Sequence, residues 1–121
     1  MSKPLILELK EKATKKVLWE KDSSVNTFTG QTITLSSDDY DYLIIFSHRT
    51  PASHTQTIGT LVEKNQTTEI QYGDYFVEYP RAWSRKVDIT DGTNVKFYDA
   101  TINGSVNNGA LIPYKILGCK Y

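Results

Sequence analysis

Apolar and polar residues alternate over several short segments of this chain, and turn-forming residues separate the segments. Residues 31–35 read Gln-Thr-Ile-Thr-Leu, which places Ile33 and Leu35 on one face of a strand. Residues 40–47 are apolar on both faces, as in an interior strand. The same criteria predict further strands at residues 16–20, 57–63, 69–72, 75–79, 82–90, 95–98 and 111–121. No segment has the period of a long helix.

The residues between these segments are typical of turns. Asp91-Gly92 is a hairpin signal that joins residues 82–90 to residues 95–98. Pro80 is expected to end the aromatic strand at residues 75–79, and the Asn- and Gly-rich residues 103–109 are expected to form a loop. Short strands at this spacing predict an all-β fold, an antiparallel β-sandwich or a jelly-roll-like arrangement.

A chain of 121 residues is the length of one domain, which we assign to residues 17–121. Residues 1–16 allow two interpretations. Leu5, Leu7 and Leu9 alternate as in an edge strand, whereas the acidic and basic residues that follow suit an N-terminal arm that packs against a neighbouring subunit. Both interpretations stay open.

The charge balance weighs against several classes of partner. Fourteen basic residues match fourteen acidic ones, so a nucleic-acid partner lacks its usual electrostatic support.

The longest apolar run, residues 42–46, is too short to cross a membrane. Residues 1–16 show no signal-peptide pattern, which predicts synthesis in a cytoplasm. The single cysteine, Cys119, is expected to be a buried, reduced thiol.

Catalytic and metal-binding signatures are weak. His48 and His54 flank a predicted loop, and Asp38, Asp39 or Asp41 could add a third ligand, but the spacing fits no local metal motif. We therefore expect both histidines to be solvent-exposed loop residues. The chain has no Gly-x-Ser-x-Gly and no phosphate-binding loop. We accordingly expect no enzymatic activity, no cofactor and no metal.

The best candidate binding residues are Tyr79, Arg81, Trp83 and Arg85. Basic side chains interleaved with aromatic ones can hold a sugar or an anionic polymer, because Trp stacks on sugar faces and Arg pairs with phosphate. In a strand, Arg81, Trp83 and Arg85 share one face. The alternative interpretation is a solvated outer face whose tryptophan packs on a neighbour.

Several segments, taken in order, resemble a module found in bacteriophage proteins. They are residues 17–20 (Val-Leu-Trp-Glu), 28–35, 40–46, 91–93 and the closing Ile112-Pro113-Tyr114-Lys115-Ile116-Leu117-Gly118. Together they are similar to the C-terminal β-rich module of small phage and prophage tail, fibre or other virion proteins of Gram-positive hosts.

The resemblance implies a structural or adhesive role in a tail, fibre or head-decoration component. It further implies location in the virion after synthesis in the bacterial host cytoplasm, and assembly as a homotrimer or higher oligomer with other virion proteins. A cell-surface glycan is then a candidate external ligand, with no nucleic acid or membrane as partner. Two alternatives remain: a free-standing carbohydrate-binding module, and a small prophage-encoded inhibitor or ligand sponge that acts inside the infected cell.

Overall fold

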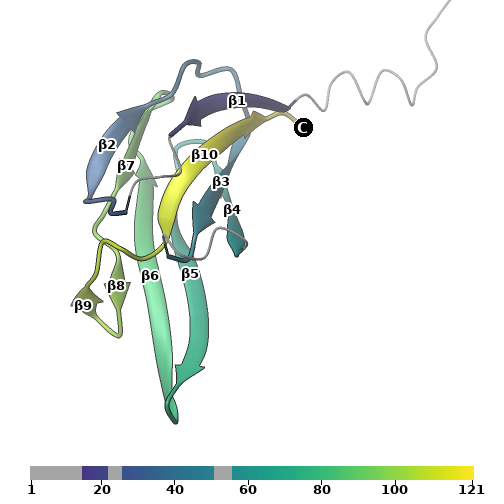
Figure 1. The fold of residues 1–121 in the computed structure, drawn as a ribbon. Coiled ribbons are helices and arrows are strands. Elements are labelled where there is room, and N and C mark those ends of the chain that lie inside the picture. The colour runs from purple at the N-terminus through teal and green to yellow at the C-terminus, as the bar shows by residue number, and fades with distance from the viewer. Residues whose placement is uncertain (1–14, 22–25, 51–55) are drawn as a thin grey trace, which may run out of the picture.

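The computed structural model describes residues 15–21, 26–50 and 56–121, which form two antiparallel sheets packed as a β-sandwich (Figure 1). This confirms the predicted all-β class. The strands are β1 (Lys15–Glu20), β2 (Gln31–Thr34), β3 (Tyr42–His48), β4 (Thr57–Glu63), β5 (Thr67–Phe76), β6 (Tyr79–Ile89), β7 (Asn94–Phe97), β8 (Thr101–Ile102), β9 (Ser105–Val106) and β10 (Ile112–Cys119). In this part of the chain no helix has the length and apolar character needed to cross a membrane. The expected N-terminal arm lies mostly outside the described residues, and its last two positions begin β1.

The first sheet has the strand order β1-β10-β3-β4. The prediction of an interior strand at residues 40–47 is confirmed, because β3 lies between β10 and β4. The closing segment forms β10, which is also interior and pairs with β1 on its other side. Leu43 and Ile45 on β3 point into the core, where they are fully buried. Cys119 is a buried free thiol, as expected.

The second sheet is organised around β6, its longest strand. β6 pairs with β5 along its full length on one side, and with β7 and β8 on the other. β5 and β6 form one long hairpin that extends beyond the rest of the sandwich (Figure 1). The predicted hairpin at Asp91-Gly92 is confirmed, since the segment joins β6 to β7 and the Asp91 carboxylate accepts backbone hydrogen bonds from Thr93 and Asn94 at 3.0 Å.

The predicted strand break at Pro80 is wrong. Residues 75–79 are not one strand, because the chain reverses at Val77-Glu78, both with positive φ (48° and 68°), and Phe76 pairs with Tyr79. Hydrogen-bonded and non-hydrogen-bonded pairs alternate away from a two-residue turn. The Tyr75–Pro80 pair, second from the turn, therefore needs no amide proton from Pro80.

Two further expectations are corrected. Part of the predicted loop at residues 103–109 is a small hairpin of β8 and β9, whose Asn103-Gly104 turn has the positive φ values (50° and 84°) that this dipeptide favours. His48 is not an exposed loop residue. It ends β3, is buried, and stacks on Tyr114 with ring centroids 4.0 Å apart. His54 lies outside the described residues.

A charged side chain lies at the centre of the otherwise apolar core. The Arg85 guanidinium is fully buried and donates to the backbone carbonyls of Tyr98 (2.8 Å), Ala110 (3.0 Å) and Leu111 (3.0 Å). It also lies over the Phe28 ring, 5.2 Å from the centroid. Burial lowers the pKa of Arg85 to about 10, so the group stays charged at neutral pH.

Replacing Arg85 with methionine is expected to lower the free energy of unfolding by about 3 to 5 kcal/mol, because two buried carbonyls and one half-buried carbonyl lose their donor. Chemical denaturation measures this change. Lys86→Met is the matched control on the exposed face of β6, and we expect a change below about 1 kcal/mol there. Equal effects of the two substitutions would contradict a central role for Arg85.

Candidate binding site on the β5–β6 hairpin

The register of the β5–β6 hairpin determines which side chains meet. Tyr72 lies opposite Trp83, and Asp74 lies opposite Arg81. Directly opposed residues share a face of the sheet, so these four side chains gather on one side of the hairpin. Alternation along β6 places Arg85 on this face too, as the sequence predicts.

Burial along this face increases from the tip of the hairpin toward the sandwich. Tyr79 is 46% exposed, Trp83 is 4% exposed and Arg85 is completely buried. Of the four predicted residues, Tyr79 and Arg81 therefore keep appreciable exposed surface, whereas Trp83 and Arg85 do not. The prediction that Arg85 contacts a ligand is wrong, because the part of β6 that carries Arg85 turns this face into the core of the sandwich. Trp83 is likewise no open stacking platform for a sugar.

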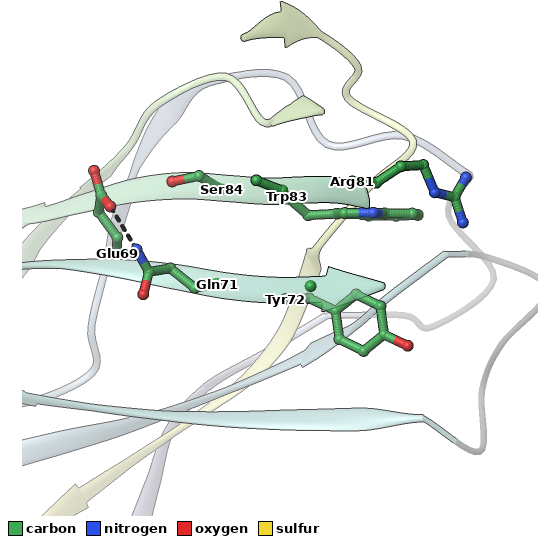
Figure 2. Close-up of a pocket in the computed structure, with 8 residues that line it drawn as sticks. Glu69, Gln71, Tyr72, Arg81, Trp83 and Ser84 are labelled. Atoms are coloured by element: carbon green, nitrogen blue, oxygen red, sulfur yellow. Dashed lines mark hydrogen bonds between the residues drawn. The ribbon is translucent and has the colours of Figure 1, made fainter. Parts of the chain in front are cut away.

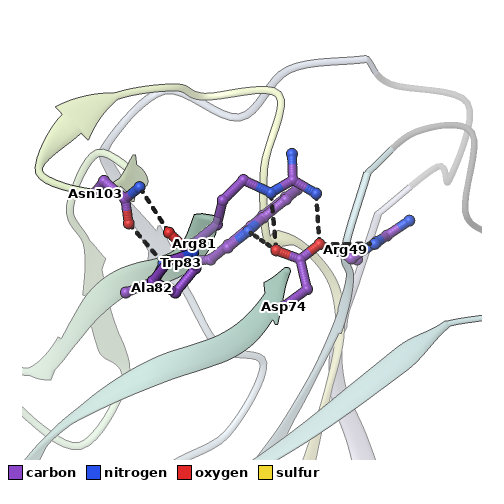
Figure 3. Close-up of polar contacts among 7 residues, drawn as sticks. Arg49, Asp74, Arg81, Ala82, Trp83 and Asn103 are labelled. Carbon is purple, nitrogen blue, oxygen red and sulfur yellow. Dashed lines mark hydrogen bonds and ion pairs between the residues drawn. The ribbon is translucent and has the colours of Figure 1, made fainter. Parts of the chain in front are cut away.

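The Asp74 carboxylate is the centre of the polar contacts on this face (Figure 3). Arg81 donates Nε to Asp74 Oδ1 at 2.8 Å and a second guanidinium nitrogen to Oδ2. The Trp83 indole donates to Oδ1 at 3.2 Å, and Arg49, just after β3, reaches Oδ2 at 3.5 Å. These donors, the Arg81 guanidinium foremost, hold the pKa of Asp74 below its usual value.

The two arginines of this network also cover the aromatic rings. The Arg81 guanidinium lies over Trp83 at 5.1 Å, and that of Arg49 lies 5.4 Å from the Tyr72 centroid. Tyr72 and Trp83 meet edge to face at 5.7 Å. Both arginines already contact a carboxylate, so an external phosphate would compete with Asp74. The cluster is thus suited to holding the hairpin three residue pairs from its turn, where Arg49 reaches it from the first sheet.

The small β8–β9 hairpin supports the same region from the side. The Asn103 side chain accepts a hydrogen bond from the Ala82 amide at 2.7 Å and donates to the Pro80 carbonyl at 3.3 Å (Figure 3). β7 pairs with β6 at residues 87–89 and does not reach this part of the strand, so the Asn103 side chain pairs with backbone groups there that β7 leaves unpaired. The β6 backbone is therefore held close to the point where the hairpin leaves the sandwich.

Beyond the Asp74–Arg81 pair, the end of the hairpin presents apolar side chains to solvent. Tyr75 is 78% exposed and Val77 is 76% exposed, with Tyr79 close by in the chain. Val77 is a β-branched residue in the left-handed region, which is an unfavourable conformation for such a side chain. Backbone strain of this kind concentrates at functional sites. We refer to Tyr75, Val77 and Tyr79 together as the hairpin tip.

A shallow pocket of about 410 Å³ lies on the hairpin (Figure 2). Its lining consists of Glu69, Gln71, Tyr72, Gly73, Arg81, Ala82, Trp83 and Ser84. Strand alternation places Glu69, Gln71 and Ser84 on the face opposite Asp74, beside the small residues Gly73 and Ala82. Gln71 donates to the Glu69 carboxylate at 3.0 Å. The hollow therefore combines small residues with amide, hydroxyl and carboxylate groups.

No family model matches this chain, and no curated protein or solved structure matches it. Its function is therefore inferred from the residues and their geometry. Among residues 15–21, 26–50 and 56–121, no three His, Cys, Asp or Glu side chains are grouped so that they could hold a metal ion.

Sequence patterns missed Arg49, Tyr72, Asp74, Tyr75 and Val77 as members of this site. The reason is the turn, because Val77-Glu78 lacks the Asn or Gly that marks a two-residue hairpin. One signal was present: Asp74 and Arg81 are equally distant from the centre of that dipeptide, as are Tyr72 and Trp83. Reading the segment as a symmetric hairpin would have paired them.

The Asp74 network is expected to open in acid. Because the folded pKa of Asp74 lies below the unfolded value, its stabilisation is complete above about pH 4 and is lost as the pH falls through the folded pKa. The Trp83 indole proton signal in NMR reports this, since it donates to Asp74.

We expect Asp74→Asn to remove this acid transition of the Trp83 signal. Asp91→Asn is the matched control, because the pKa of Asp91 is also lowered but the residue lies in the β6–β7 loop. The Asp91 variant should keep the transition. An unchanged titration in the Asp74 variant would show that another group controls the Trp83 environment.

Proposed function

We propose that this chain is a non-enzymatic structural and adhesive component of a bacteriophage or prophage particle, in a tail, fibre or head-decoration position. Its resemblance to virion modules supports the particle assignment. The observation that carries the adhesive role is the projecting β5–β6 hairpin with an exposed apolar tip.

The hairpin tip has the properties of a contact surface. Tyrosines offer large, rigid areas with a polar end, and they are enriched at protein interfaces. The strands just behind the tip are held by the Asp74 ion pairs and by Asn103, so the tip is displayed from a fixed support. Ordering before binding lowers the entropic cost of association. The proposed partners are other virion proteins and the host surface.

Mass spectrometry and immunogold labelling of virions from the strain that carries the gene test the particle assignment. We expect the chain in purified particles at a fixed copy number. A chain found only in the lysed-cell fraction would contradict the virion role and favour an inhibitor that acts inside the cell.

Binding of labelled protein to intact Gram-positive cells tests the tip. Replacing Tyr75 and Val77 with serine should weaken cell binding by about tenfold or more, because exposed interface anchors are removed. Val106→Ser is the matched control, since Val106 is 65% exposed on the separate β8–β9 hairpin. Equal binding by both variants would exclude the tip as the contact.

A carbohydrate-binding module is the second candidate, and the pocket over Gln71 favours it. Amide, hydroxyl and carboxylate groups around a shallow hollow can hydrogen-bond sugar hydroxyls. Titration with soluble cell-wall oligosaccharides should then shift the Gln71 and Ser84 NMR signals saturably.

Gln71→Ala should abolish these shifts, whereas Gln31→Ala, on exposed β2, should leave them intact. Shifts that survive the Gln71 substitution would place the sugar elsewhere, and no shift at all would remove this candidate.

A further inference from the structure

The first sheet is apolar on both of its faces. In β3, Leu43 and Ile45 point into the core, so alternation directs Tyr42, Ile44 and Phe46 to the outer face. An antiparallel sheet with one face in water normally carries polar residues there. The outer face of this sheet departs from that pattern.

One row of apolar residues crosses all four strands of this face. Val17 on β1 pairs with Leu117 on β10, Leu117 pairs with Ile44 on β3, and Ile44 pairs with Leu61 on β4. Val17 and Leu61, at the two edges, are 42% and 56% exposed. Nothing in the described chain covers this row fully.

Aromatic residues extend the row on both sides. Phe46 lies over the open position of Gly59, where a Cβ would be 3.8 Å from its Cε1 atom, and it contacts the Tyr114 ring at 6.4 Å between centroids. On the other side, Tyr42 and Tyr121 have centroids 5.3 Å apart. The outer face is therefore mainly apolar, although the row through Phe46 also holds Lys115 on β10 and Glu20 at the β1 edge.

This face is smaller than a standard protein interface. Four strands about 4.8 Å apart and seven residues long at about 3.3 Å each cover roughly 19 by 23 Å, or about 440 Å². This area includes the charged residues Lys15, Glu20, Lys115 and Glu63, so the apolar part is smaller; the largest apolar patches on monomers are about 300 to 600 Å². The whole face is about half of the 800 Å² that each partner buries in a standard interface.

The charges at the edges indicate what covers it. Lys15 on β1 and Glu63 on β4 occupy the two ends of one row, with Cys119 and Tyr42 between them. The two charges are three strands apart, about 14 Å, which exceeds the screening length of about 8 Å at physiological salt. They hardly interact within one chain.

We propose that a second copy of this chain packs on this face, related by a two-fold axis parallel to the strands. Such an axis places β1 of one copy over β4 of the other, so each Lys15 meets the partner's Glu63 and the apolar rows pack on each other. A flat face that contacts itself is closed by one such axis, which favours a pair over the trimer or ring implied by the resemblance. The proposal stands independently of the hairpin's function.

Sedimentation equilibrium across a concentration series tests the surface. The wild-type chain should approach twice its 13.8 kDa mass. Leu61→Glu should raise the dissociation constant at least tenfold, since it puts a charge in the apolar row. Val106→Glu puts the same charge at an exposed apolar residue of the β8–β9 hairpin and should leave the constant unchanged. A wild-type monomer at millimolar concentration, or equal effects of both substitutions, would overturn the proposal.

A charge-reversal pair tests the two-fold arrangement and leaves the apolar row unchanged, although Glu63→Lys also removes the acceptor of the Tyr121 hydroxyl. Lys15→Glu and Glu63→Lys should each weaken self-association, because each sets like charges opposite one another. An equimolar mixture of the two variants should associate about tenfold more tightly than either alone, since both contacts are then matched. No gain on mixing, or a mass of three or more chains, would overturn the two-fold arrangement.

Discussion

The buried guanidinium of Arg85 connects the parts of this molecule that would otherwise be joined only by apolar packing. It belongs to β6 and donates to the carbonyl of Tyr98, just after β7, and to those of Ala110 and Leu111, which lead into β10. The planar guanidinium spreads five donors over three nitrogens, so it reaches three carbonyls at separate places, whereas the donors of a lysine all lie on one nitrogen. These hydrogen bonds connect the second sheet to the residues just before β10, an interior strand of the first sheet.

The same connection continues to the base of the hairpin. Leu111, held in a positive-φ conformation (49°), donates its amide to the Arg49 carbonyl at 2.9 Å while its own carbonyl accepts from Arg85. Arg49 in turn reaches Asp74 with its side chain. A continuous polar path therefore runs from the core to the ion pairs that hold the β5–β6 hairpin. This path explains how the end of a long hairpin can project from a small sandwich while the Asp74–Arg81 region behind it stays ordered.

Sequence patterns predict the strands of this fold better than they predict the site. Alternation is a local property, so β2, β3 and β4 follow directly from residues 31–35, 40–47 and 57–63. The burial of Arg85 and Trp83 depends on how far β6 runs into the core, which no local pattern contains. The turn at Val77-Glu78 has an unfavourable backbone conformation that the pairing of the two strands maintains. Without knowledge of this turn, the sequence does not predict that Asp74 pairs with Arg81.

The two surfaces left apolar by this fold call for different partners. The hairpin tip is narrow, convex and projects from the sandwich, so it suits a recess on another molecule. The outer face of the first sheet is broad, with opposite charges at opposite edges, so it suits a copy of itself. Because the hairpin belongs to the other sheet, pairing through the first sheet would leave both tips available. Two tips in one such pair would then bind together, which raises avidity without any new contact in either site.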